Sequence, residues 1–64
     1  MEIKIEIWKN SGKWYTTITE HVETIEEIDI FMSNFNSCKG MTATVYYWKG
    51  NVDNYYQPYR IFKL

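Results

Sequence analysis

The N-terminal segment alternates between apolar and charged residues. Isoleucine occupies every second position from Ile3 to Ile7, and charged side chains stand between the isoleucines. This period of two predicts a β-strand with one buried face. The Asn-Ser-Gly sequence of residues 10–12 then supplies turn chemistry, and residues 13–19 are rich in β-branched and aromatic side chains. We therefore predict an antiparallel hairpin.

The register of this hairpin follows from which side chains face the isoleucines. A shift of one residue would place Tyr15, Thr17 and Thr19 opposite them and turn Ile18 to the other face. We prefer the register that keeps Ile18 on the isoleucine face. Its pairs are Ile7 with Trp14, Ile5 with Thr16, and Ile3 with Ile18.

A helix is predicted next, over residues 25–36. Thr24 and Glu27 have the spacing of a capping box, in which the threonine hydroxyl caps the helix and the glutamate reaches back. Apolar side chains then recur at spacings of three, four and seven residues, which places them on one helix face. They are Ile25, Ile28, Phe31, Met32 and Phe35. Gly40 is predicted to take a left-handed turn conformation beyond the helix.

A second hairpin is predicted for the C-terminal part. Residues 41–48 alternate again, residues 49–54 form a turn, and the last strand is most secure over residues 59–64. Pro58 has no N–H for a ladder, so it belongs at a strand start or on an edge strand. The pattern leaves open both the inward face of the last strand and the strand order. The predicted fold is α+β, a single ββαββ domain over residues 1–64 with two antiparallel hairpins in one four-stranded sheet and a helix on one face.

One short helix covers only one face of such a sheet. The predicted floor beneath it comprises Ile3, Ile5, Ile7, Trp14, Ile18, Val45 and Tyr47. The other face then presents large aromatic side chains and lysines to water, where antiparallel sheets usually present polar residues. Exposed aromatics of this kind are typical of binding hot spots. The predicted partner-binding residues are Trp8, Tyr15, Tyr46, Trp48, Lys4 and Lys13.

Simpler interpretations stay open for these surfaces. Aromatic pairs across neighbouring strands also stabilise small sheets without binding anything, or the register is the inverse of the predicted one. Ile30 falls on the water-facing side of the predicted helix, among acidic residues, and a single exposed isoleucine is ordinary. A helix face that docks on a partner is the less favoured alternative for Ile30.

Composition and charge exclude several classes of protein. The formal net charge of −1 gives no strong basic field, and an aromatic content of 19% excludes a disordered tail. The single cysteine, Cys38, excludes an intramolecular disulfide framework. Charges interrupt every apolar run, so we predict neither a signal sequence nor a membrane span. The expected location is the cytoplasm of a bacterial host, and the richness in Ile, Lys, Asn and Tyr favours a low-GC bacterium, a phage or a mobile element.

The residues that carry catalytic chemistry do not form a constellation. His21 is the lone histidine and precedes the predicted helix, whereas Cys38 follows its far end, so a dyad is not expected. Acidic residues at the helix start suit the helix dipole better than a metal ion. We therefore expect no enzyme activity, no cofactor and no metal site.

These observations favour a small non-catalytic protein-binding module, such as a phage accessory protein or inhibitor that acts on a host protein. The alternative is a single-stranded nucleic-acid binder that uses the same aromatics. That alternative needs a basic rim, for which the candidates are Lys4, Lys9, Lys13, Lys49 and Arg60. Because so short a chain is marginal as a monomer, we also expect a homodimer, formed by packing the aromatic faces or by pairing a strand edge.

Overall fold

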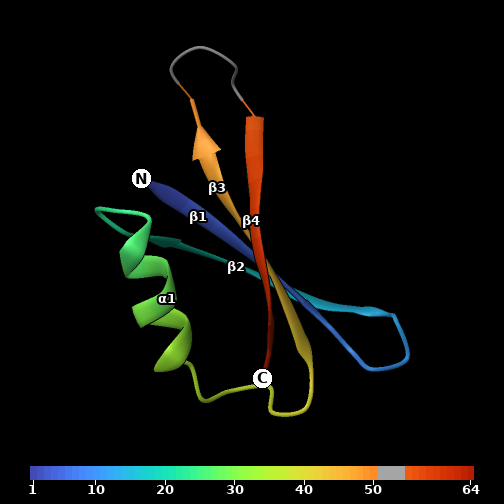
Figure 1. Ribbon diagram of the computed structural model, residues 1–64. Helices are drawn as coiled ribbons and strands as arrows, with labels where there is room; N and C mark the ends of the chain where they lie inside the picture. Colours follow the sequence, from blue (N-terminus) through green and yellow to red (C-terminus); the bar gives the residue numbers. More distant parts are fainter. Residues whose placement is uncertain (51–54) are drawn as a thin grey trace.

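The alternating isoleucines form the centre of the sheet. A computed structural model describes residues 1–50 and 55–64 (Figure 1). Its elements are β1 (Glu2–Trp8), β2 (Trp14–His21), α1 (Glu26–Ser33), β3 (Thr42–Lys49) and β4 (Tyr55–Lys63). The strands make one antiparallel sheet in the order β2-β1-β3-β4. This confirms the predicted α+β, ββαββ fold; the predicted turn over residues 49–54 includes 51–54, which lie outside the described residues.

The core lies between the helix and one face of the sheet. Ile3, Ile5 and Ile7 are fully buried, as predicted from their period of two. Their neighbours on β3 include Val45, which pairs with Ile5, and Tyr47, which pairs with Ile3. The buried core comprises Ile3, Ile5, Ile7, Val22, Ile28, Met32, Ala43 and Val45. The helix therefore packs on the isoleucine face, and no element among residues 1–50 and 55–64 covers the other face.

The predicted register of the first hairpin is wrong by two residues. Ile5 pairs with Ile18, and Ile7 pairs with Thr16. The predicted register leaves a two-residue loop of Asn and Ser, and the turns that suit such a loop need positive φ at one or both positions. The chain instead places Gly12, with φ +88°, at the end of a three-residue loop. The Gly12 N–H donates to the Lys9 carbonyl at 2.9 Å, and the Lys9 N–H donates to the Lys13 carbonyl at 2.8 Å.

A β-bulge in β2 decides which face each of its side chains occupies. Trp8 pairs with Trp14, whereas Ile7 pairs with Thr16, so Tyr15 is an extra residue between them. The bulge returns Ile18 to the isoleucine face and places Trp14 on the face of Trp8. The prediction that Trp14 belongs to the floor beneath the helix is therefore wrong, and its side chain is 56% exposed.

The helix is shorter than predicted and begins differently. Its N-cap residue is Ile25, which has no polar side chain, so the predicted capping role of the Thr24 hydroxyl is wrong. Glu27 does reach back, but its Oε2 accepts a hydrogen bond from the Glu23 N–H at 3.4 Å. The helix ends at Ser33, where the Ile30 carbonyl accepts three hydrogen bonds: from the Ser33 hydroxyl at 2.8 Å, from the Asn34 side-chain amide at 3.1 Å and from the Asn34 backbone N–H at 3.2 Å.

The two remaining turn predictions concern glycine and proline. Gly40 has a φ of +85°, which confirms its left-handed conformation, and Cys38 with φ +56° shares that conformation without having been predicted. Pro58 lies in β4, an edge strand, as its missing N–H predicts.

A second bulge turns part of β4 towards the helix. Val45 pairs with Arg60 and Tyr46 pairs with Pro58, so Tyr59 is the extra residue. The Tyr59 hydroxyl donates to Asp29 Oδ2 at 2.8 Å, and Arg60 Nη1 donates to Asp29 Oδ1 at 3.1 Å. These two contacts tie the helix to the far edge of the sheet, and they settle the inward face of the last strand, which the sequence pattern left open.

Candidate functional site

The uncovered side of the sheet is the candidate site, and we call it the open face. Paired residues of antiparallel strands share a face, so the register defines which side chains belong to it. β1 contributes Glu2, Lys4, Glu6 and Trp8. The other strands contribute Trp14, Thr17, Thr19, His21, Thr42, Thr44, Tyr46, Trp48, Tyr56, Pro58, Ile61 and Lys63.

A lysine between two tyrosine rings forms the centre of the open face. Lys4 Nζ lies 4.8 Å from the centroid of the Tyr46 ring and 4.6 Å from that of Tyr56. Glu6 Oε2 lies 3.7 Å from the same nitrogen. Lys4 therefore joins β1, β3 and β4 through cation–π contacts, which contribute about 0.5–1 kcal/mol each at exposed sites.

Carboxylates complete this group, which we call the Lys4 cluster: Glu2, Lys4, Glu6, Tyr46, Trp48 and Tyr56. The Tyr56 hydroxyl donates to Glu2 Oε1 at 2.6 Å, and the Trp48 and Tyr56 rings meet edge to face with centroids 5.0 Å apart. The hydrogen bond to Glu2 is the main cause that raises the pKa of Tyr56. Desolvation raises the pKa of Tyr46, and the hydrogen bond and charge of Glu6 add to the effect. Two carboxylates against one ammonium make the cluster acidic.

A second aromatic group lies at the hairpin end of β1. Trp8 pairs with Trp14 of β2 and with Thr42 of β3. The Trp14 indole N–H donates to Thr17 Oγ1 at 2.9 Å, which holds the ring over the open face. Tyr15, at the bulge, is exposed, with Lys9 Nζ 5.7 Å from its ring centroid.

The structure brings together four of the six predicted partner-binding residues on the open face: Lys4, Trp8, Tyr46 and Trp48. Tyr15 lies at the bulge, outside the regular pairing, and Lys13 lies in the turn before β2. Sequence reasoning missed Trp14, Tyr56 and Ile61. The turn conformation that Gly12 favours could have indicated on which face Trp14 lies. No local pattern indicated which side chains of β4 lie on the open face.

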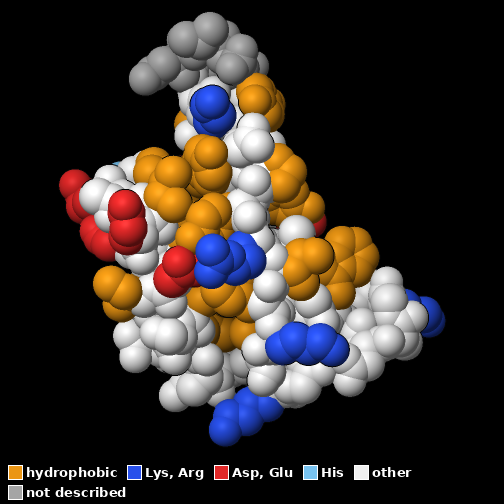
Figure 2. All heavy atoms as spheres, viewed as in Figure 1, with side chains coloured by type: hydrophobic (Ala, Val, Ile, Leu, Met, Phe, Trp, Pro, Cys, Tyr) orange, Lys and Arg blue, Asp and Glu red, His pale blue; other side chains and the backbone are white. Residues whose placement is uncertain are grey.

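The predicted basic rim does not assemble. Arg60 lies on the helix side of the sheet, where it forms an ion pair with Asp29. Lys49 follows Trp48 in β3, so it lies on the opposite face from Trp48, which is the face of Tyr47 and the isoleucines. Lys4 is already engaged by Glu6 and two rings. In the view of Figure 2, acidic side chains gather over the helix, whereas lysine and arginine side chains are spread singly over the strands and loops. The prediction that all five basic residues gather on the sheet side is wrong for Arg60 and Lys49.

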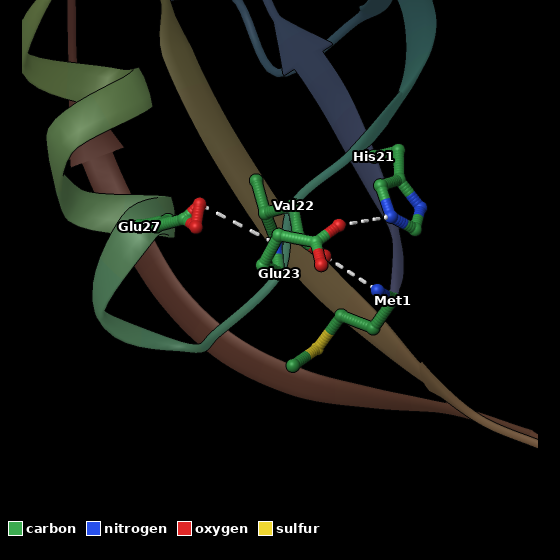
Figure 3. Close-up of polar contacts among 5 residues, drawn as sticks. All are labelled: Met1, His21, Val22, Glu23 and Glu27. Carbon is green, nitrogen blue, oxygen red and sulfur yellow. Dashed lines mark hydrogen bonds and ion pairs between the residues drawn. The ribbon is translucent and has the colours of Figure 1, made fainter.

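The lone histidine takes part in a polar group where β2 leads into the helix (Figure 3). His21 Nε2 lies 2.8 Å from Glu23 Oε2, and both side chains are well exposed. The Met1 nitrogen donates to the Val22 carbonyl, and the Val22 N–H donates to the Met1 carbonyl at 2.9 Å. These bonds fasten the ends of β1 and β2 to each other. A surface pair such as His21–Glu23 contributes about 0–1 kcal/mol.

Comparison with protein-family models, with curated proteins and with solved structures finds no match to this chain. Among residues 1–50 and 55–64, no helix has the length and apolar character needed to cross a membrane. The same residues contain no group of three His, Cys, Asp or Glu side chains placed to hold a metal ion.

Proposed function

We propose that this protein is a non-catalytic protein-binding module that engages its partner through the open face. The observation that carries the proposal is the exposure of large apolar side chains on the side of the sheet that no element covers. Ile61 is 65% exposed there, Trp14 is 56% exposed, and Trp48 is also exposed. Aromatic side chains on an apolar patch are typical of the energetically dominant part of a protein interface.

The charges of the open face support a protein partner over a nucleic acid. Glu2 and Glu6 lie within the Lys4 cluster, so a phosphate group placed over the tyrosine rings would meet carboxylates. Phosphate neutralisation supplies much of the affinity for nucleic acids, and it needs cations that are free to engage. A protein with an apolar centre and basic residues around it complements this surface. We extend the proposal to the predicted origin, an accessory protein or inhibitor of a phage or mobile element that acts on a host protein.

Capture from a low-GC bacterial lysate tests the proposal. The immobilised wild type is compared with the Trp48→Ala/Ile61→Ala double variant, and Ile30→Ala serves as the matched control. Ile30 is 60% exposed but lies on the helix, away from the open face. The double variant is expected to lose the captured protein, and the control is expected to retain it. Equal recovery by the double variant, with an unchanged circular dichroism spectrum, would exclude the open face as the binding surface.

Single-stranded nucleic-acid binding is the alternative, favoured by tryptophan and tyrosine rings on a four-stranded sheet. It predicts that oligonucleotides quench tryptophan fluorescence and that added salt reverses the quenching. Absence of quenching at low salt, alongside successful protein capture, would reject this alternative.

A further inference from the structure

In the part of the chain that the structure describes, β2 and β4 are the two edges of the sheet, and each pairs with a strand on one side only. The two edges differ in how readily they can bind another strand. β4 contains Pro58, which has no N–H to donate, and a bulge at Tyr59 that breaks the regular spacing. It also carries Arg60 and Lys63. Proline, bulges and charges are the features by which natural sheets block their edges. The β4 edge is therefore unsuited to pairing.

The β2 edge lacks most of this protection. Residues 14–19 (Trp-Tyr-Thr-Thr-Ile-Thr) contain neither a charge nor a proline and have high β-propensity. The bulge at Tyr15 lies at the hairpin end, so the pairing from Thr16 to His21 is regular. Thr17 and Thr19 are exposed, and Ile18 is only partly buried although it lies on the helix side of the sheet. This edge presents an incomplete sheet and an incomplete core.

The hydrogen bonds at the start of β1 show which backbone groups point outward. Met1 and Val22 exchange both of their backbone hydrogen bonds, so they form a hydrogen-bonded pair of the antiparallel ladder. Such pairs alternate with non-bonded pairs. Ile18, which pairs with Ile5 in the same register, is therefore bonded towards β1. The N–H and C=O groups of Thr17, Thr19 and His21 then point away from the sheet.

We propose that β2 pairs antiparallel with β2 of a second copy of this chain, about a two-fold axis at Ile18. This pairing makes one sheet in the order β4-β3-β1-β2-β2-β1-β3-β4. The outward groups of Thr17 bond to those of Thr19 in the second copy, and the symmetry repeats the pair. Ile18 lies against its own copy on the helix side. The inference goes beyond the proposed function and does not depend on it.

Three features favour a second copy as the occupant. With the two-fold axis at Ile18, each residue of β2 pairs with a residue that lies on the same face in the second copy, such as Thr17 with Thr19. Both helices therefore lie on the same side of the joined sheet, and the two open faces become continuous. The residues nearest the axis, from Thr17 to Thr19, are uncharged, so no like charges oppose each other there. The blocked β4 edges end the assembly at two copies, whereas two open edges would give an open-ended filament.

Sedimentation equilibrium of the wild type and of the edge variant Thr19→Pro tests the proposal. Proline removes an N–H that points outward, so the contacts between β1 and β2 stay intact. We expect twice the monomer mass for the wild type and the monomer mass for the variant at the same high micromolar concentration. The open-face variant Trp48→Ala/Ile61→Ala is expected to stay dimeric. A monomeric wild type, or a dimer that Thr19→Pro leaves intact, would overturn the pairing.

Disulfide cross-linking tests the axis without relying on the proline variant. In a Cys38→Ser background, Ile18→Cys places a thiol against its own copy, at a non-bonded pair where β-carbons come closest. Thr16→Cys is the matched control, because it lies on the same face of β2 but opposes Glu20 of the second copy. Mild oxidation is expected to give a covalent dimer at least tenfold faster for Ile18→Cys than for Thr16→Cys. Equal rates would contradict the axis at Ile18.

A monomeric wild type that still captures a protein through the open face would refute the pairing and leave the proposed function standing. Dimerisation lost in Trp48→Ala/Ile61→Ala but kept in Thr19→Pro would instead show that the aromatic faces pack together.

Discussion

Lys4 connects three strands through one side chain. Its ammonium group lies between the rings of Tyr46 on β3 and Tyr56 on β4, and it lies near Glu6 on its own strand. On a face without a covering helix, such contacts replace part of the packing that a second layer would supply. The Lys4 cluster is therefore a stabilising feature of the open face as well as the centre of the proposed binding surface.

We expect Lys4→Gln to lower the free energy of unfolding by about 1 kcal/mol, because it removes two cation–π contacts and one surface ion pair. Urea denaturation followed by circular dichroism measures the change. Lys9→Gln is the control, since Lys9 faces a single exposed ring at 5.7 Å and its loss should change stability less. Equal effects of the two substitutions would contradict the role assigned to Lys4.

Tyr59 makes stability depend on alkaline pH. The hydrogen bond to Asp29 is the main cause that raises the pKa of Tyr59 in the folded state, whereas the unfolded pKa is about 10. The stabilisation is complete below that unfolded pKa and is lost as pH rises through the folded one, because the unfolded chain releases its proton first. Tyr59→Phe is therefore expected to weaken the fall of unfolding free energy above pH ~10. An unchanged slope would contradict this assignment; Tyr55→Phe is the control, because its hydroxyl bonds the uncharged Gln57 side chain at 2.9 Å.

At the scale of elements, a turn and two bulges arrange the sheet. Both edge strands contain one extra residue, Tyr15 in β2 and Tyr59 in β4. The first bulge moves Trp14 to the open face, and the second directs Tyr59 and Arg60 to Asp29 on the helix. An extra residue in each edge strand therefore determines both the content of the candidate site and the attachment of the helix.

The first turn depends on the conformation of Gly12. Gly12→Ala is expected to lower the free energy of unfolding by about 1–2 kcal/mol, because φ is +88° and an L side chain is strained there. No other group lies within 4 Å of the added β-carbon, so the cost comes from the backbone alone. Gly12→Asn should cost less, since asparagine tolerates this region better. Thermal unfolding of the two variants compares them, and equal stability would contradict the turn conformation.

For the molecule as a whole, the fully buried strand residues all lie on the helix side of the sheet. Ile5 is fully buried, between neighbours that include Val45 and Ile18. By contrast, Ile61 is exposed on the open face. Replacing each of these two isoleucines by alanine therefore compares the contribution of the two faces to stability.

Ile5→Ala is expected to lower the free energy of unfolding by about 2–5 kcal/mol, a large share of the total for a chain of this length. Ile61→Ala should change it by about 0.5 kcal/mol or less. Chemical denaturation measures both values. A large loss for Ile61→Ala would show that the open face is structural rather than free for a partner.

The sequence alone determined the four strands, the single helix and the buried isoleucine face, because the period of two in β1 and β3 is a local property. It also placed Lys4, Trp8, Tyr46 and Trp48 on the uncovered face, since those residues lie out of phase with the core. The tertiary structure decided the positions of Trp14, Ile61 and Arg60, the strand order and the exposed β2 edge. A bulge moves every residue beyond it to the opposite face of the sheet. Its position in the strand depends on two requirements: the turn at one end of the strand must close, and the apolar side chains further along must reach the core. No local pattern contains both of those constraints.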